Sequence, residues 1–135
     1  MIYFDTDVLV HSVVLQTRAA QLLAVDTIQS AMVEGKYTVS QLVLQELAFV
    51  LARIGVEPVL IQENLRFHSK FTEFRISDSI FDRAVALAGK LGFRHINDCL
   101  HTAIAETFCE ELVTFNAKDF KKISAMTTLK ITILA

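Results

Sequence analysis

Short apolar runs of β-forming residues alternate along the chain with longer amphipathic runs, and this alternation constrains the fold most. The short runs predict strands at 1–4, 37–39, 71–74, 112–114 and 129–134. The runs between them predict helices at 8–14, 19–34, 41–54, 58–68, 79–91 and 98–108. Strands joined through helices pair in parallel, so we expect an α/β fold: a three-layer α/β/α sandwich with a central, mostly parallel sheet of about five strands.

Length, charge and cysteine content narrow the class of protein. A chain of 135 residues is long enough for one domain with a core, so we expect a single domain over 1–135. The net charge of -2 gives no overall attraction for nucleic acid, although it is compatible with a local basic patch. The only two cysteines, Cys99 and Cys109, fall in one predicted helix, which favours reduced thiols over a disulfide framework.

The sequence also bears on location and partners. No uninterrupted apolar run approaches the roughly 20 residues of a membrane span, and the N-terminus lacks the basic start and cleavage site of a signal peptide. We therefore expect a cytoplasmic protein that does not enter a membrane. The hydrophobic content of 53% is high for a small, charge-balanced domain and leaves room for apolar surface covered by a partner or a second copy.

Polar side chains follow three of the predicted strands. Asp5 and Asp7 come directly after the first strand, Ser40 follows the second and is a candidate helix cap, and Asn116 follows the strand at 112–114. Ligands of parallel sheets usually bind outside the carboxyl ends of the strands. This edge of the sheet is therefore where we expect the function to lie.

Glu46 is the most informative single acid in the chain. Its neighbours at three and four residues along a helix are all apolar: Leu42, Val43, Phe49 and Val50. A carboxylate on such a face loses hydration at a cost of several kcal/mol unless it is neutralised, paired with a cation or bound to a metal. The alternative is a helix rotated so that Glu46 lies at the edge of the apolar stripe with its tip in water.

Asp98, Asn116 and Asp119 also have ordinary structural explanations. Asp98 lies at or just inside a helix N-terminus, where Asp is a common cap, and Asn116 and Asp119 are typical of turns and caps after a strand. Together with Asp5 and Glu46, however, they bring oxygen ligands from distant segments to one sheet edge. Hard cations such as Mg²⁺ and Mn²⁺ take that kind of ligand set.

Four segments carry a resemblance to a known family. The segments IYFDTDVLV, VSQLVLQELAFVL, INDCLHTAIAE and TFNAKDF resemble, in order and over almost the whole chain, the four motifs of the PIN-domain nucleases. The chain is most similar to VapC-type toxins of bacterial toxin-antitoxin pairs. The resemblance implies a metal-dependent endoribonuclease that hydrolyses RNA phosphodiester bonds, is neutralised by a small antitoxin protein and forms a homodimer.

The resemblance also implies roles for individual residues. Asp5, Glu46 and Asp98 correspond to the acids that bind Mg²⁺ or Mn²⁺ in this family, and the fourth motif supplies Asn116, with Asp119 close by. Asn116 stands where an acid is common, which bears on whether a second metal is held. Asp7 stands where the family often has Asn or Ser, so its charge either changes metal affinity or faces solvent.

Basic residues and one histidine flank these motifs. Candidate contacts to the RNA backbone are Arg94, His95, Lys118, Lys121 and Lys122, although such clusters are more often a solvated face. His101 comes one helical turn after Asp98. It can touch the site, but a packed or surface histidine is the commoner case.

Two alternatives stay open. The Asp5 and Asp7 pair also resembles the first motif of haloacid-dehalogenase-type phosphatases, in which Asp5 would be the nucleophile. Val8 and Leu9 replace the Gly-Thr pair that follows in that family, and its later acidic motif is missing. The other alternative is a non-catalytic PIN-like module that binds RNA or protein. Clustered acids raise one another's pKa unless a cation is present, so keeping Asp5, Glu46 and Asp98 would be unfavourable in a module that no longer binds metal. This argues against the non-catalytic alternative.

Overall fold

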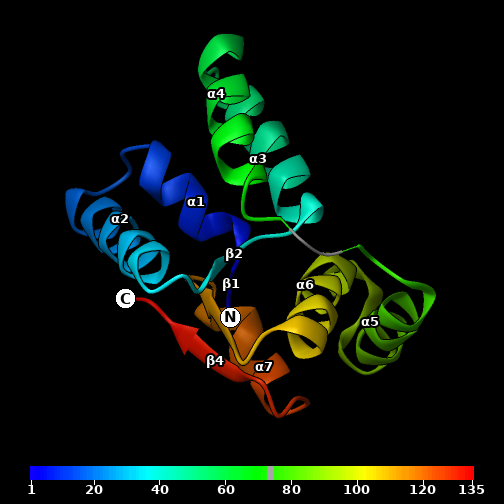
Figure 1. The fold of residues 1–135 in the computed structure, drawn as a ribbon. Helices are drawn as coiled ribbons and strands as arrows, with labels where there is room; N and C mark the ends of the chain where they lie inside the picture. The colour runs from blue at the N-terminus through cyan, green and yellow to red at the C-terminus, as the bar shows by residue number, and fades with distance from the viewer. Residues whose placement is uncertain (73–74) are drawn as a thin grey trace.

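A computed structural model describes residues 1–72 and 75–135 of the chain. Figure 1 shows its helices and strands along the chain. In order they are β1 (Ile2–Phe4), α1 (Thr6–Val13), α2 (Arg18–Val33), β2 (Tyr37–Thr38), α3 (Gln41–Arg53), α4 (Pro58–Ser69), α5 (Asp78–Leu91), the 3₁₀ helix η1 (Phe93–His95), α6 (Ile96–Phe108), β3 (Glu111–Thr114), α7 (Ala117–Ser124) and β4 (Lys130–Ile133).

The described strands form one parallel sheet in the order β2-β1-β3-β4. Tyr3 of β1 is in register with Thr38 of β2 and with Leu112 of β3. A parallel sheet joined by helices confirms the predicted α/β fold. All strands end at the same edge, so the residues that follow β1, β2 and β3 are brought together.

The prediction of about five strands differs from the four that the described residues form. Of the predicted strand at 71–74, residues 73–74 lie outside the described residues. Phe71 and Thr72 do not pair as a strand: their backbone N–H groups donate to the carbonyls of His68 and Ser69 and close the turn after α4. Aromatic and β-branched residues carry a strand signal, but here the local turn bonds prevail.

Helices lie on both faces of the sheet. Side chains alternate between faces along a strand, so Tyr3 and Phe4 point in opposite directions. The hydroxyl of Tyr3 meets His101 of α6, whereas Phe4 borders a groove shared with Ser30 of α2. Figure 1 shows α1 and α2 packed together on one side of the molecule, α5 and α6 on the other, and the α3–α4 hairpin standing away from the sheet.

Several helix starts follow from local side-chain caps. The Ser40 Oγ accepts from the Val43 N–H, which confirms Ser40 as a helix cap, and the Ser77 Oγ accepts from the Ile80 N–H at the start of α5. Pro58 opens α4, where its missing N–H leaves no intrahelical bond unmade. Helix α7 has no counterpart in the sequence prediction, because its eight residues form only about two turns and bury only two side chains, Phe120 and Ile123.

The core fills the space between the sheet and its helices. Its largest fully buried side chains come from both strands and helices: Tyr3, Phe4, Leu9, Leu47, Leu51, Leu87, Ile104, Leu112, Phe120 and Ile123. Among the described residues, no single helix is long and apolar enough to cross a membrane. Helices α1 and α2 together have the length and composition for a span, but they are bent by 118° where they join.

Candidate active site

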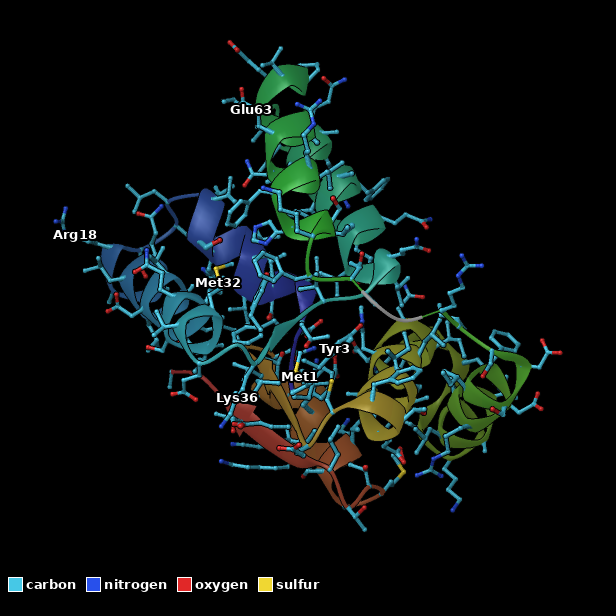
Figure 2. All side chains as sticks on the ribbon, viewed as in Figure 1. Met1, Tyr3, Arg18, Met32, Lys36 and Glu63 are labelled. Atoms are coloured by element: carbon cyan, nitrogen blue, oxygen red, sulfur yellow. The ribbon has the colours of Figure 1, made fainter. Side chains whose placement is uncertain are left out.

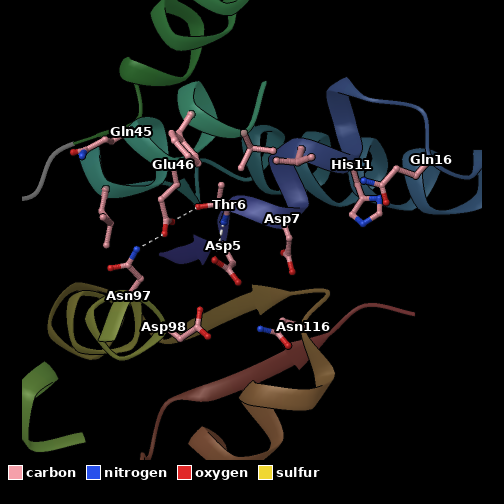
Figure 3. A pocket seen from close by; sticks show the side chains of 14 residues that line it. Asp5, Thr6, Asp7, His11, Gln16, Gln45, Glu46, Asn97, Asp98 and Asn116 are labelled. Atoms are coloured by element: carbon pink, nitrogen blue, oxygen red, sulfur yellow. Dashed lines mark hydrogen bonds between the residues drawn. The ribbon is translucent and has the colours of Figure 1, made fainter. Parts of the chain in front are cut away.

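One pocket gathers acids from three segments and an asparagine from a fourth at the carboxyl edge of the sheet. Asp5 lies between β1 and α1, Glu46 projects from α3, Asp98 lies in the first turn of α6, and Asn116 begins α7 after β3. All four line a pocket of about 690 Å³, together with Asp7. In Figure 3 the side chains of Asp5 and Asp7 point from one wall toward Asp98 and Asn116 on the other. The structure therefore brings together four of the five predicted site residues.

Asp5 is fixed by the two elements on either side of it. Its Oδ1 accepts from the Thr6 N–H at 2.8 Å at the start of α1, and its Oδ2 accepts from the Thr114 hydroxyl at 2.8 Å at the end of β3. The residue is only 5% exposed. Asp5 is therefore a buried carboxylate held rigidly at the centre of the sheet edge.

Asp7 faces the pocket rather than open solvent. Its two carboxylate oxygens accept from the Phe115 N–H at 3.1 and 3.2 Å, and its Oδ2 accepts from the Thr114 hydroxyl at 3.2 Å. Burial, and next the charge of Asp5, raise the pKa of Asp7 to about 7. Of the two possibilities left by the sequence, the structure favours the one in which the charge of Asp7 acts on the site.

Glu46 is held by three donors. Its Oε1 accepts from the Thr6 hydroxyl at 2.6 Å and contacts the His101 Nε2 at 2.5 Å, while its Oε2 accepts from the Asn97 amide at 3.0 Å. Burial alone would raise the pKa of Glu46, but the hydrogen bond and charge of His101, with the bonds from Thr6 and Asn97, lower it. The side chain is 25% exposed, so the tip is neither free in water nor enclosed in the core.

Asp98 lies in the first turn of α6, but the cap position belongs to His95. Burial raises the pKa of Asp98 to about 7, and the charge of Asp5 is the next cause. Asp119 and Glu46 raise it further, while the charge of His101 lowers it. Asp98 thus belongs electrostatically to the acidic cluster, where its ionisation is opposed by its neighbours.

The fourth segment places Asn116 and Asp119 differently. Asn116 lines the pocket and caps α7: its Oδ1 accepts from the Asp119 N–H at 3.2 Å, and its Nδ2 donates to the Asp119 Oδ2 at 3.0 Å. Asp119 lies outside the pocket lining, beside His95, whose Nδ1 is 3.8 Å from the Asp119 Oδ1. Ligand atoms of His95, Asp98 and Asp119 lie within 4.8 Å of one another, so these three could share a cation.

The predicted RNA contacts lie outside the pocket. Arg94, Lys118, Lys121 and Lys122 are exposed, and none of them lines it. His95 is turned toward Asp119 instead of toward solvent. The structure therefore does not bring the basic residues together with the acids in one cavity.

Sequence reasoning missed the residues that hold the acids in place. Thr6, Asn97 and Thr114 donate to Glu46 or to Asp5. His101, for which the sequence left contact with the site and packing both open, is buried and contacts Glu46. The only available signal was their position, since each is adjacent to a candidate acid, one helical turn from it, or last in a strand. The pocket also has an apolar wall and a distal end that the motifs do not include, formed by Val10, His11, Gln16, Leu42, Phe49 and Val50.

The donor set suits a hard divalent cation. Asp5, Asp7, Glu46 and Asp98 offer carboxylate oxygens, and Asn116 adds an amide oxygen, in the proportions that Mg²⁺ and Mn²⁺ prefer. The raised pKa values of Asp7 and Asp98 express the repulsion and desolvation that a cation would relieve. The cluster is therefore a candidate site for a divalent metal ion.

Comparisons with known proteins agree with this architecture. The chain is similar to a structure described as a VapBC2 complex from Rickettsia felis bound to a DNA fragment from their promoter, with 21% identity, a TM-score of 0.71 and coverage of 100% of both chains. It is also similar to a toxin-antitoxin complex from Klebsiella pneumoniae, with 24% identity, a TM-score of 0.64 and coverage of 91% of this chain and 92% of that one. No curated protein sequence matches the chain. The PIN domain model matches residues 2–126, and the chain therefore belongs to the PIN domain family.

Proposed function

We propose that this chain is a divalent-metal-dependent endoribonuclease that hydrolyses RNA phosphodiester bonds. The observation that carries the proposal is the convergence of Asp5, Glu46, Asp98 and Asn116 on one pocket at the carboxyl edge of the sheet. Membership of the PIN domain family, whose members are typically nucleases, supports the same chemistry. With a volume of about 690 Å³, the pocket has room for a phosphate with part of its nucleotide.

The residues of the site have different proposed roles in binding Mg²⁺ or Mn²⁺ and in catalysis. Asp5, Glu46 and Asp98 are the proposed ligands. Asn116 in the pocket and Asp119, bonded to it outside the pocket lining, complete the proposed catalytic set. When bound, the metal activates water as a nucleophile and offsets charge on the phosphate. Thr6, Asn97 and Thr114 keep the carboxylates oriented through the hydrogen bonds that they donate.

Asn116 and Asp119 act as a pair in this proposal. The amide of Asn116 donates to the Asp119 carboxylate, so a substrate or metal that draws on one also affects the other. Asp119 thereby supplies the acid that the fourth motif lacks at Asn116. His95, 3.8 Å from Asp119, lies beside this pair.

RNA is the proposed substrate, and its backbone continues beyond the pocket. Arg94, His95, Lys118, Lys121 and Lys122 are the proposed contacts to flanking phosphates, with the four exposed cations outside the pocket acting as a diffuse positive rim. Such contacts provide affinity rather than sequence selection. The pocket wall of apolar side chains is better suited to a base or to a protein segment.

A small antitoxin protein is the proposed partner, and the chain is proposed to be the cytoplasmic toxin of such a pair. The two similar structures are described as toxin-antitoxin assemblies, one of them on promoter DNA. The α3–α4 hairpin carries large exposed apolar side chains that a partner or a second copy would cover, among them Phe49 (66% exposed), Val59 (62%) and Phe67 (45%). We propose a homodimer for the same reason.

The test is cleavage of a mixed, end-labelled RNA pool by the purified, antitoxin-free protein. Wild type is assayed with Mn²⁺ or Mg²⁺ and with a chelator, beside Asp98→Asn and the matched surface variant Asp82→Asn, an exposed acid on α5. We expect metal-dependent cleavage by wild type and Asp82→Asn, and loss of cleavage in Asp98→Asn.

Intact RNA in every lane, from folded protein that binds metal, would overturn the nuclease proposal. The same preparation is then offered a small phosphomonoester. Turnover would indicate the phosphatase alternative with Asp5 as nucleophile, and its absence would favour a non-catalytic binding module.

A further inference from the structure

A buried chain of hydrogen bonds links Ser40, at the start of α3, through Tyr3 and His101 to Glu46 on the same helix. The Tyr3 hydroxyl on β1 lies 2.6 Å from the Ser40 Oγ and 2.7 Å from the His101 Nδ1 on α6. The other ring nitrogen of His101, Nε2, lies 2.5 Å from the Glu46 Oε1. Tyr3, Ser40 and His101 are each at most 1% exposed, so water does not compete for these bonds.

The direction of one bond in this chain does not depend on the charge of His101. A carboxylate only accepts, so the contact with Glu46 places a proton on the His101 Nε2. In the neutral ring Nδ1 then accepts from the Tyr3 hydroxyl, and in the charged ring it donates to it. In both cases His101 has a partner at each nitrogen, and its ring orientation is fixed from both ends.

This chain of hydrogen bonds connects the three elements that carry or precede the acids Asp5, Glu46 and Asp98. Asp5 follows β1, which bears Tyr3; Asp98 is on α6, which bears His101; and Glu46 is on α3, which Ser40 caps. His101 lies between two of these acids, since its Nε2 is also 3.8 Å from the Asp5 Oδ1. Figure 2 places Tyr3 in the interior, on the side of the sheet facing α6.

We propose that Tyr3 and His101 form a positioning clamp that sets Glu46 relative to Asp5 for metal binding. The proposal rests on the proposed function for its effect on metal binding, whereas the hydrogen bonds themselves are formed by side chains of the protein alone. Neither residue touches the metal or the substrate in this proposal. Their role is to fix the side-chain rotamer of Glu46 and to hold α3, β1 and α6 at fixed positions relative to one another at the site.

The first test observes the clamp without any metal. In protein with ¹⁵N-labelled histidine, we expect a slowly exchanging ring N–H signal from the His101 Nε2, because the group is buried and bonded. The signal should shift in Glu46→Gln, where the acceptor becomes neutral. It should stay in place in Tyr37→Phe, which removes the hydroxyl from a second tyrosine–histidine pair, Tyr37 with His68.

The second test measures the Mn²⁺ dissociation constant directly, by the electron paramagnetic resonance signal of free Mn²⁺. Loss of outer-shell partners typically weakens metal binding about 10- to 100-fold, and we expect this range for His101→Leu. His101→Gln, which keeps an N–H donor, should recover much of the affinity. Tyr3→Phe should weaken binding less than His101→Leu, and Tyr37→Phe should leave it unchanged.

Thermal unfolding of the same variants separates positioning from packing. Tyr3→Phe removes the bonds of the hydroxyl to His101 and Ser40, and Tyr37→Phe removes the bond to His68, so we expect both variants to lose Tm and Tyr3→Phe to lose more. If Mn²⁺ affinity follows Tm in both, or if folded Tyr3→Phe and His101→Leu bind Mn²⁺ like wild type, the clamp is overturned. Tyr3→Phe keeps this test available if His101→Leu does not fold.

Failure of the proposed function gives a different pattern. Wild type would then leave RNA intact whether or not it bound Mn²⁺, while the His101 ring signal would still respond to Glu46→Gln. Absence of that signal, or indifference to Glu46→Gln, would overturn the clamp even in an active nuclease.

Discussion

Two buried tyrosine–histidine pairs with nearly the same geometry lie on opposite faces of the sheet. The Tyr3 hydroxyl lies 2.7 Å from the Nδ1 of His101, and the Tyr37 hydroxyl lies 2.8 Å from the Nδ1 of His68. The ring centroids are 5.7 and 5.8 Å apart, with interplanar angles of 55° and 54°. Tyr37 is in register with Ile2, so the alternation of side chains along β1 places it on the face opposite to Tyr3.

The surroundings of the two histidines differ, and so does their acid–base chemistry. Burial alone would lower the pKa of His101, but the Glu46 hydrogen bond and the charges of Asp5 and Glu46 raise it. The pKa of His68 is lowered to about 4 by burial among aromatic rings. The same local pair is therefore part of a charged site on one face and part of an uncharged core on the other.

The largest expected effect is an acid sensitivity that belongs to His68. Between about pH 6.5 and about pH 4 the unfolded chain binds a proton that native His68 does not, so the free energy of unfolding falls as pH falls. The full loss is about 3 kcal/mol. Urea unfolding at intervals across this range should show a shallower pH slope in His68→Asn, which keeps a polar group near the Tyr37 hydroxyl.

The pH dependence of stability that His101 contributes has the opposite sign to that of His68, so His101 provides the control. Its native pKa is raised, so the stabilisation it provides is complete below its ordinary pKa and is lost as pH rises through the native value. His101→Gln should therefore change the slope on the alkaline side of the profile. An unchanged acid slope in His68→Asn would show that the two pairs do not differ as described.

The next effect concerns Asp7, one of the clustered acids in the pocket at the carboxyl edge of the sheet. The pKa of Asp7 is raised from 3.8 to about 7, so native Asp7 keeps a proton that the unfolded chain releases, and stability falls as pH rises through this interval. Asp7→Asn removes that loss. Because an amide is also unfavourable to bury, we expect a gain of about 2 kcal/mol in the metal-free protein above pH 7.

Chelator-treated protein should show this gain above pH 7 in chemical denaturation and little of it near pH 4, where Asp7 is protonated in native protein. Added Mn²⁺ should reduce the gain, because a bound cation stabilises the charged form of Asp7. A gain that is the same at both pH values would mean that Asp7→Asn acts through packing and not through charge.

The sequence predicted the positions of the acids better than their environment. The apolar neighbours of Glu46 correctly indicated an acid that needs partners, but they do not all belong to the core: Val43 is fully buried, whereas Phe49 is 66% exposed and lines the pocket with Leu42 and Val50. Helical spacing identifies neighbours along one helix. It does not identify what packs against that face, since this depends on distant segments.

The network around the acids could not be predicted for the same reason. His101 is 55 residues from Glu46 and 98 from Tyr3, and Thr6 is 40 from Glu46, so no local pattern records these contacts. The sequence predicts helix α1 from residue 8, two residues after its start at Thr6, because the apolar run that marks it begins at Val8. In the structure Asp5 is the cap of that helix, which turns its neighbours toward the pocket.

The smallest expected effect compares two serine caps, one inside the clamp and one outside it. Ser77→Ala removes an exposed cap of α5 and should lower the free energy of unfolding by about 1 kcal/mol. Ser40→Ala removes the cap of α3 and also a buried bond to Tyr3, so its loss should exceed that of Ser77→Ala by about 1 kcal/mol. Denaturant unfolding measures both, and equal losses would indicate that the Ser40 bond to Tyr3 adds nothing to the stability of the site face. A larger loss in Ser40→Ala that disappears when Tyr3→Phe is already present would locate the extra stability in that bond, because only interacting residues depart from additivity.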